Sequence, residues 1–411
     1  MAKKPVTESV LYLDTENELF HIYTMTDGAW DSLSCYLGNY KAKPFSADFY
    51  LKLGETLDSF RESHPDVPLQ KLSVVLPDSV IITDTLNVPT IGKRAMSRSV
   101  NVVLSNIFKN SKELTFNHTL AAQNPQFSTY SVVGTQKSVL ARLHKTLSEH
   151  QVGISNITYA SSCAASCVCS VIPKLKSASF VILDMKEKFT RMVFVAKGRA
   201  IAFLRIPFGS DILNDAQVIP EEQLLDHSAA ELIVLNAREK ARSKAITLLD
   251  KPLDEYPDED SEESSDIASK TSGAFLKHSK SARRLPAHLI RPMPETKEGF
   301  IYENFRSILK WALGAISSNV PTCALGSPDS IYLNMPEKYS FLYPILADES
   351  EECGIKIQQL FSETLPESIK TNPEVFGGFF YAQMNKGNNF TLSAFPEFAV
   401  DSEAEASTKK S

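Results

Sequence analysis

The chain has 411 residues, 43% of them hydrophobic and 22% charged, and carries a net charge of −6. This length predicts two or more domains of an ordinary globular protein. The acidic balance gives no electrostatic basis for binding nucleic acid or inserting into an anionic membrane. No apolar run reaches the roughly 20 residues of a membrane span.

Hydrophobic periodicity predicts alternating strands and helices along most of the chain, with Ser46 as the cap of the first helix. In chain order we predict strands 10–13, 19–25 and 29–36, a helix after Ser46, strands 72–76 and 80–88, a helix 93–108, strands 115–122 and 127–134, a helix 136–151, a strand 156–159, a helix 160–171, strands 180–183, 192–196 and 200–206, helices 221–240 and 300–316, a strand 331–333, a helix 339–346, a strand 355–360, a helix 372–384 and a strand 389–393.

Two parts of the chain share one outline: an apolar strand that leads to an aspartate, a polar turn and a return strand. The first spans residues 10–25 around Asp14, and the second spans residues 180–206 around Asp184. In the second part, Gly198 can supply the positive φ of a tight hairpin turn. A repeated supersecondary unit predicts two related lobes.

The cysteines and the first residues of the chain indicate in which cellular compartment the protein is expected. Residues 1–9 are basic and polar and lack the apolar core of a signal peptide. Six cysteines in a chain of this length do not form a disulfide framework, and the spacing of Cys163, Cys167 and Cys169 fits no zinc motif. We therefore expect buried thiols, no metal site and a cytoplasmic protein.

The composition changes after the predicted helix 221–240. Residues 254–266 contain eight acidic residues in thirteen positions, and basic residues follow between Lys277 and Arg291. Such a stretch cannot bury enough apolar surface to offset its ordering entropy. We predict a flexible insertion over residues 242–296 and a disordered tail over residues 399–411.

Three segments carry a resemblance to a known family. LSVVLPDSVIITDTLNVP at residues 72–89, the run from Thr129 to Ser166, and GGFFYAQMNKGNNFTLSAFPEF at residues 377–398 resemble segments of PilM proteins of type IV pilus assembly, in the same order. The paired strand–Asp units resemble those of the wider actin-like ATPase superfamily, which includes FtsA. The resemblance implies an α/β, actin-like two-lobed fold (a duplicated ribonuclease H-like fold) with an inserted α+β subdomain.

This resemblance also implies how the chain divides. We expect the N-terminal part of a first actin-like lobe (1–71), an inserted subdomain of the 1C type (72–151), a return to the first lobe (152–178), a second lobe (179–241), the flexible insertion (242–296), the second lobe continued (297–371), a second return to the first lobe (372–398) and the tail (399–411).

In actin-like proteins, the two aspartate turns bind the nucleotide phosphates and magnesium through an Asp-x-Gly pattern. A backbone that approaches phosphate closely needs glycine, because its N–H groups must point inward without a Cβ. Here the corresponding positions hold Glu16 and Lys186, and the glycine pair expected near the adenosine is replaced by Asn334-Met335-Pro336. All three loops are altered.

Two interpretations of these turns stay open. If nucleotide binding is retained, the resemblance assigns ATP and magnesium to Asp14, Thr15, Asp184, Lys186 and Thr190. Otherwise Asp14 and Asp184 only end strands and cap turns, as Asp often does, and no cofactor is bound. We favour the second interpretation, a pseudo-ATPase without assigned catalytic residues.

The PilM resemblance implies a cytoplasmic scaffold of a type IV pilus or related secretion machine. Such a protein would bind the N-terminal peptide of a PilN-like inner-membrane partner, lie at the inner membrane through that partner, and contact the pilus motor ATPases. The tail has no apolar face that could act as the membrane-targeting helix of FtsA-type proteins. The alternative functions are a nucleotide-binding, polymerising actin-like ATPase and a sugar kinase of the same superfold.

We expect the peptide groove beside the predicted strand 80–88 and the helix that follows it. Val80 and Ile82 are the apolar candidates, and Lys93, Arg94 and Arg98 are candidate anchors for acidic or carbonyl groups. The alternative is that these basic residues form a solvated helix face.

Overall fold

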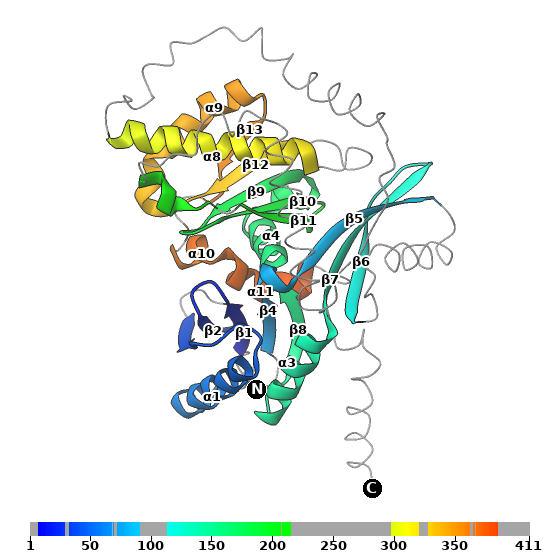
Figure 1. The fold of residues 1–411 in the computed structure, drawn as a ribbon, viewed down its shortest axis with the longest axis vertical. Helices are drawn as coiled ribbons and strands as arrows, with labels where there is room; N and C mark the ends of the chain where they lie inside the picture. Colours follow the sequence, from blue (N-terminus) through cyan, green and yellow to red (C-terminus); the bar gives the residue numbers. More distant parts are fainter. Residues whose placement is uncertain are drawn as a thin grey trace, which may run out of the picture. The chain divides into compact units, whose positions relative to one another are not determined.

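The computed structural model describes residues 7–28, 33–67, 69, 72–90, 113–206, 208–214, 297–319, 328–361, 365 and 367–384. The chain forms two units: residues 1–178, 195–203 and 364–411 belong to unit 1, and residues 179–194 and 204–363 to unit 2 (Figure 1). Outside the described residues lie the predicted helices 93–108 and 221–240, the strand 389–393, the insertion 242–296, the tail, and Lys93, Arg94 and Arg98.

The main sheet of unit 1 has five strands in the order β3-β2-β1-β4-β8. Its central strand β1 pairs antiparallel with β2 on one side and parallel with β4 on the other. All five residues of β4 are buried, as expected for a parallel strand covered on both faces. The strands are β1 (Thr7–Asp14), β2 (Leu19–Thr26), β3 (Ser34–Asn39), β4 (Leu72–Leu76) and β8 (Ile154–Tyr159).

One apolar cluster of unit 1 joins this sheet to α1 (Ala47–Ser63) and α3 (Lys137–Glu149). The predicted cap of α1 is confirmed, since the Phe49 N–H donates to the Ser46 hydroxyl oxygen at 3.3 Å. Leu53 from α1 and Leu143 from α3 are fully buried in this cluster. The apolar periodicity of both helices therefore reports their buried faces.

The small-residue helix α4 (Ala160–Val171) packs closely against α11 (Pro373–Met384). A Cβ placed on Gly377 would lie 1.7 Å from the Cys163 carbonyl oxygen, so the two backbones touch there. Cys163, Cys167 and Cys169 are completely buried, which confirms the expectation of buried thiols. Their burial raises the pKa of the Cys169 thiol to about 12.

A separate three-stranded antiparallel sheet has the order β5-β7-β6. Its strands are β5 (Ile82–Pro89), β6 (Leu114–Gln123) and β7 (Phe127–Gln136), and the short 3₁₀ helix η2 (Asp78–Val80) precedes it. The inserted subdomain was expected from residue 72, yet β4 belongs to the main sheet between β1 and β8. All five residues of β4 are buried, as in a strand covered on both faces, and the separate sheet begins only at β5.

Unit 2 contains a second five-stranded sheet, in the order β11-β10-β9-β12-β13. The strands are β9 (Ser179–Met185), β10 (Thr190–Ala196), β11 (Arg199–Ile206), β12 (Ser330–Asn334) and β13 (Lys356–Gln359). As in unit 1, a hairpin adjoins the aspartate-bearing strand, and two parallel strands follow on its other side. The predicted duplication is confirmed.

The turn between β10 and β11 consists of Lys197 and Gly198, with φ values of 50° and 73°. Two positive φ values in a two-residue loop are those of a type I′ turn, which matches the twist of the hairpin strands. The sequence predicted this turn from Gly198. Residues 195–203, the outer part of this hairpin, group with unit 1.

The apolar core of unit 2 contains one face of α8 (Lys297–Asn319). On this face Ala312 is fully buried, and Phe305 and Leu309 are nearly so. The predicted helix 339–346 is instead the 3₁₀ helix η7 (Glu337–Ile345), and α9 (Leu346–Cys353) follows it. Pro344 lies inside η7 and has no N–H to donate, which disfavours a regular α-helix. The remaining elements are η3 (Pro173–Ser177), η4 (Ser210–Asn214) and α10 (Glu367–Thr371).

The predicted strand 29–36 begins later, at Ser34, and residues 29–32 are outside the described part. None of the described helices combines the length and apolar character that a bilayer crossing requires.

The close contact at Gly377 predicts that alanine substitutions at two neighbouring glycines of α11 destabilise the protein to different extents. We expect Gly377→Ala to lower the free energy of unfolding by about 3 kcal/mol or more, because its Cβ meets backbone that cannot move aside. Gly378→Ala is the matched control on the same helix: its Cβ meets side-chain methyl groups of Val10 at 2.8 Å and Val75 at 3.1 Å instead of backbone, so a cost of about 1 kcal/mol is expected. Urea unfolding measures both, and equal losses would contradict the close packing of α11 on α4.

Candidate functional site

Asp14 ends β1, and its carboxylate is bonded within the turn that follows. The Oδ1 atom accepts the backbone N–H groups of Glu16 at 3.0 Å and Asn17 at 3.1 Å. The Oδ2 atom accepts the Asn17 side-chain amide at 2.7 Å and lies 3.2 Å from His21 Nε2. Asp14 is only 5% exposed. Its own hairpin thus supplies four donors to the carboxylate, in the manner of an Asx turn.

Asp14 and His21 stabilise each other as an ion pair. Burial raises the pKa of Asp14, but hydrogen bonds from His21 and Asn17 outweigh it and hold this pKa below its ordinary value. Burial lowers the pKa of His21, yet the hydrogen bond to Asp14 raises it to about 9. At neutral pH the histidine is therefore protonated and cancels the aspartate charge.

Thr15 and Glu16 occupy the turn positions where a phosphate-binding loop would need open backbone. Both are half-buried, and the Thr15 hydroxyl lies 3.4 Å from that of Ser79. The Glu16 N–H donates to Asp14, so this turn amide is already used. The carboxylate of Glu16 would repel a phosphate at this turn.

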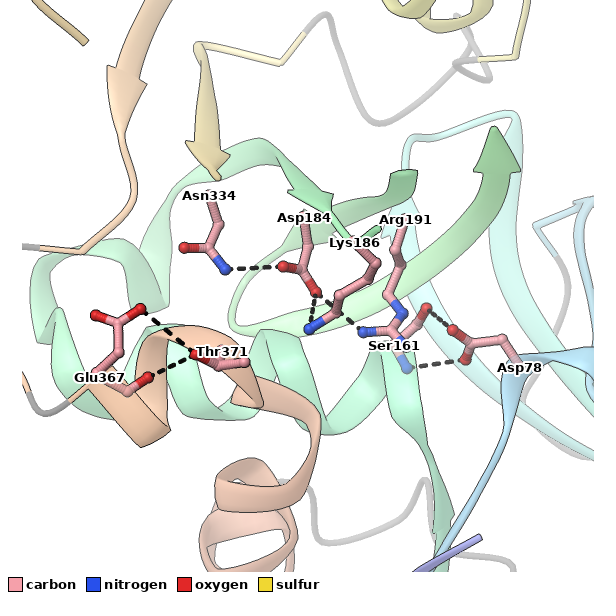
Figure 2. Close-up of polar contacts among 8 residues, drawn as sticks. All are labelled: Asp78, Ser161, Asp184, Lys186, Arg191, Asn334, Glu367 and Thr371. Atoms are coloured by element: carbon pink, nitrogen blue, oxygen red, sulfur yellow. Dashed lines mark hydrogen bonds and ion pairs between the residues drawn. The ribbon is translucent and has the colours of Figure 1, made fainter. Parts of the chain in front are cut away.

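Asp184 in unit 2 is fully buried near the end of β9 and faces two cations. Its Oδ2 lies 3.1 Å from Lys186 Nζ and 3.1 Å from Arg191 Nη1, and its Oδ1 accepts the Asn334 side-chain amide at 2.8 Å (Figure 2). The Arg191 side chain is 3% exposed, whereas that of Lys186 is 19% exposed. The structure thus brings together Asp184 and Lys186, which the sequence places in one turn.

Two members of this cluster were not among the predicted site residues. Arg191 directly precedes the apolar run of β10, and Asn334 lies at the end of β12, directly opposite Asp184 in the parallel register. A charged residue inside an otherwise buried strand was the available signal, because such a charge requires a partner. The predicted Thr190 has a different role: its hydroxyl donates to the Phe208 carbonyl at 2.8 Å.

The charge balance around Asp184 disfavours a divalent cation. One buried carboxylate faces two positive side chains, Lys186 and Arg191, which occupy contacts that a divalent cation at Asp184 would need. At an effective dielectric constant of about 20, like unit charges 4 Å apart repel by about 4 kcal/mol, and the repulsion doubles for a divalent ion. Within the described residues, no group of three or more His, Cys, Asp or Glu side chains could hold a metal.

The same sequence separation links the aspartate to its cation in both units. His21 lies seven residues after Asp14, and Arg191 lies seven residues after Asp184. In each case the cation comes from the return strand of the hairpin, β2 or β10. The duplicated unit therefore carries a duplicated ion pair.

The first turn of α4 is capped by an aspartate from another segment of unit 1. Asp78 accepts the Ser161 N–H at Oδ1 (2.9 Å) and the Ser161 hydroxyl at Oδ2 (2.8 Å) (Figure 2). Helix N-termini are common phosphate sites because their N–H groups are free. Here a carboxylate already occupies that position.

The two described candidates for the peptide groove lie at the start of the three-stranded sheet. Val80 is half-buried against the unit 1 core, and its carbonyl accepts the Thr135 hydroxyl at 2.8 Å. Ile82 is half-buried and lies opposite Gly134 of β7. Their candidate anchors Lys93, Arg94 and Arg98 are outside the described residues.

No family model matches the chain, and a search of curated proteins finds no relative. Among solved structures, a chain of a PilM-PilN type IV pilus biogenesis complex matches with a TM-score of 0.52 and 10% identity, over 92% of this chain and 99% of that chain. The cytoplasmic domain of EpsL, an inner-membrane component of the type II secretion system of Vibrio cholerae, has a TM-score of 0.36 and 9% identity, over 51% of this chain and 74% of that domain. The ethanolamine utilization protein EutJ of Carboxydothermus hydrogenoformans has a TM-score of 0.38 and 9% identity, with 92% of each chain covered.

The first match establishes the fold, since it spans nearly all of both chains. The protein has the actin-like fold of PilM, and the resemblance that the sequence indicated is confirmed at this level. The two matches with TM-scores under 0.5 add nothing to that conclusion.

The ion pair of Asp14 and His21 predicts a specific pH dependence. Because the folded pKa of His21 is about 9 and its ordinary value 6.5, its stabilisation is fully present below pH 6.5 and is lost as the pH rises through 9. We expect the free energy of unfolding to fall by about 3 kcal/mol across this window, and His21→Gln to remove most of that fall.

Urea unfolding between about pH 6 and pH 10 measures the effect, with His64→Gln as the control that should keep the decline of the parent chain. A parent chain whose stability falls no more steeply than that of His21→Gln would contradict the ion pair.

Proposed function

We propose that this chain is a PilM-like scaffold protein of a type IV pilus or related secretion machine, and that it is a pseudo-ATPase. The observation that carries the proposal is an actin-like fold, shared with PilM over 92% of the chain, whose two aspartate turns are neutralised by cations of the chain itself. Such a protein has two five-stranded sheets and a separate three-stranded sheet whose surfaces can bind other proteins, while its phosphate-binding turns are altered.

Three features of the turns support the absence of ATP turnover. Glu16 and Lys186 replace the glycines that would let backbone N–H groups approach a phosphate. Asp184 is buried between Lys186 and Arg191, which would repel the magnesium of a bound nucleotide. The four donors to the Asp14 carboxylate come from its own hairpin, which leaves that carboxylate little free acceptor capacity.

The matched structure is a complex of PilM with PilN, which suggests a partner for this chain. We infer that the chain binds a short N-terminal peptide of a PilN-like inner-membrane protein and lies at the cytoplasmic side of that membrane through this contact. Val80 and Ile82, with Lys93, Arg94 and Arg98 as anchors, form the proposed groove. The pilus motor ATPases are further proposed partners.

One observation favours the second candidate function, a nucleotide-binding actin-like ATPase that polymerises. Both units keep an aspartate at the same place, at or next to the end of the first hairpin strand. If Lys186 turned toward a phosphate instead of Asp184, the turn of unit 2 would regain a phosphate ligand. This function requires ATP and magnesium, whereas the scaffold function requires neither.

The scaffold function predicts peptide binding that does not depend on nucleotide. A synthetic peptide with the N-terminal cytoplasmic sequence of the PilN-like protein from the same genome should bind the full chain with a dissociation constant on the order of 1–10 µM. Calorimetric titration should give the same affinity in MgATP and in EDTA. The triple variant Lys93→Glu, Arg94→Glu, Arg98→Glu should weaken binding about tenfold or more, because it reverses the charge of the anchors.

The control is Lys174→Glu with Lys176→Glu, which reverses two exposed cations of η3. This variant should bind as the parent chain does. Absence of peptide binding, or binding that appears only with MgATP, would contradict the scaffold function.

A further inference from the structure

Strand β6 is an edge of the three-stranded sheet, and among the described strands only β7 pairs with it (Figure 1). An edge strand presents backbone N–H and C=O groups that a further extended segment can pair with. The pairing of β6 with β7 shifts between Leu120 and Ala122, so Ala121 forms a bulge in the middle of the strand. Leu120 is 43% exposed at this point.

A cavity of about 270 Å³ lies between this part of β6 and the outer turn of the β10–β11 hairpin. Both walls belong to unit 1. The hairpin is held on the sheet by the Ser131 hydroxyl, which donates to the Ile201 carbonyl at 2.6 Å. The lining residues are Thr119, Leu120, Ala121 and Ser131 of the sheet and Ala196, Lys197, Arg199, Ala200 and Ile201 of the hairpin.

Two cations of this cavity have no ionic partner among the residues that the structure describes. Lys197 is exposed and Arg199 is half-buried, and within the described residues neither side chain takes part in an ion pair. Lys186 and Arg191, by contrast, both pair with Asp184. Cations that lack an ionic partner in the described part of the chain, beside a hydroxyl group such as that of Thr119, favour a carboxylate ligand.

The two sides of the three-stranded sheet differ in polarity, which restricts the ligand further. On the side of Ser131, the register places Thr119 and Thr85 as its direct neighbours. On the other side, Tyr130 has Leu86 and Leu120 as neighbours. A strand added beside β6 would therefore have hydroxyls and cations on one side and apolar residues on the other, with side chains alternating between them.

We propose that β6 and the β10–β11 turn bind an extended segment of another protein in which acidic and apolar residues alternate. The acidic side chains contact Lys197 and Arg199, and the apolar ones lie beside Leu120. A small anion is a poorer ligand for this surface, because contacts with solvent-exposed cations alone contribute little. Pairing with the edge of β6 supplies the additional interactions. This surface is separate from the groove at Val80 and Ile82 and does not require the pilus-type function.

The test uses the full chain and a fluorescein-labelled synthetic peptide, Glu-Val-Glu-Val-Glu-Val-Glu, with fluorescence anisotropy as the readout. The double variant Lys197→Gln with Arg199→Gln should bind about tenfold more weakly and keep the circular dichroism spectrum of the parent chain, since Gly198 preserves the turn. Lys41→Gln with Lys43→Gln, an exposed pair with the same spacing, should bind as the parent does. A peptide with Gln in place of Glu should also bind about tenfold more weakly.

Hydrogen exchange separates pairing at β6 from contact with charge alone. On addition of the Glu peptide, amide exchange in β6 should slow about tenfold or more, while β5, the opposite edge of the same sheet, should not change. Protection of β5, or none of β6, would overturn the proposal, as would equal binding of the parent chain and the Lys197, Arg199 variant.

Two other occupants of the surface are distinguished in the same assay. If inorganic phosphate at the peptide's own half-saturating concentration displaces it, the cavity is a small-anion site and the proposal is wrong. If deletion of the acidic residues 254–266 raises the affinity for the peptide tenfold or more, this chain's own acidic segment is the ligand, and the proposal of a partner protein is likewise overturned. Peptide binding that changes neither with phosphate nor on deletion of residues 254–266 supports the proposal of a partner protein.

Discussion

A buried carboxylate must have a partner of opposite charge, and Asp184 meets this requirement with Arg191 and Lys186. Transfer of an isolated charge into the protein interior costs several kcal/mol after relaxation, and removal of one partner of a buried pair costs about 3–5 kcal/mol. The position of Asp184 near the end of β9 is therefore stabilised by Arg191 from the adjacent strand β10 and by Lys186 from the turn between the two strands. Here the chain itself completes the charge balance.

The two units satisfy the same requirement with different chemistry. His21 and Arg191 hold equivalent places, seven residues after their aspartates, but histidine can lose its charge and arginine cannot. The pair in unit 1 is thus sensitive to pH through its histidine, whereas the arginine of unit 2 does not lose its charge. Asn17 and the turn amides further bind Asp14, while Asn334 from a parallel strand further binds Asp184. In both hairpins the aspartate pairs with a cation from the return strand, whereas the other hydrogen-bond donors differ between the two units.

Local patterns were sufficient to predict much of the fold. The bounds of β4 and α4 agree with the sequence, because a short, mainly apolar run and a small-residue run ended by Pro173 are both well delimited. The hairpin turn at Gly198 was also predictable, since two-residue loops require positive φ. By contrast, the placement of β4 between β1 and β8 depends on long-range pairing that no local pattern contains.

The candidate site was predictable only in part. Asp14, Asp184 and Lys186 were found because they stand where the resemblance expects phosphate-binding turns. Arg191 and Asn334 were missed, because only the strand register brings them within 3.1 Å and 2.8 Å of Asp184. The cavity at Lys197 and Arg199 was not predicted either, since it depends on how the outer hairpin meets the three-stranded sheet.

Isothermal titration calorimetry of MgATP into the full chain measures whether the Asp184 cluster leaves room for a nucleotide. If Lys186 and Arg191 take the place of a magnesium ion at Asp184, no saturable binding will be observed at MgATP concentrations up to about 1 mM, the weak end of the affinity scale. One-to-one binding with a micromolar dissociation constant, dependent on magnesium and abolished by Asp184→Asn, would contradict the account.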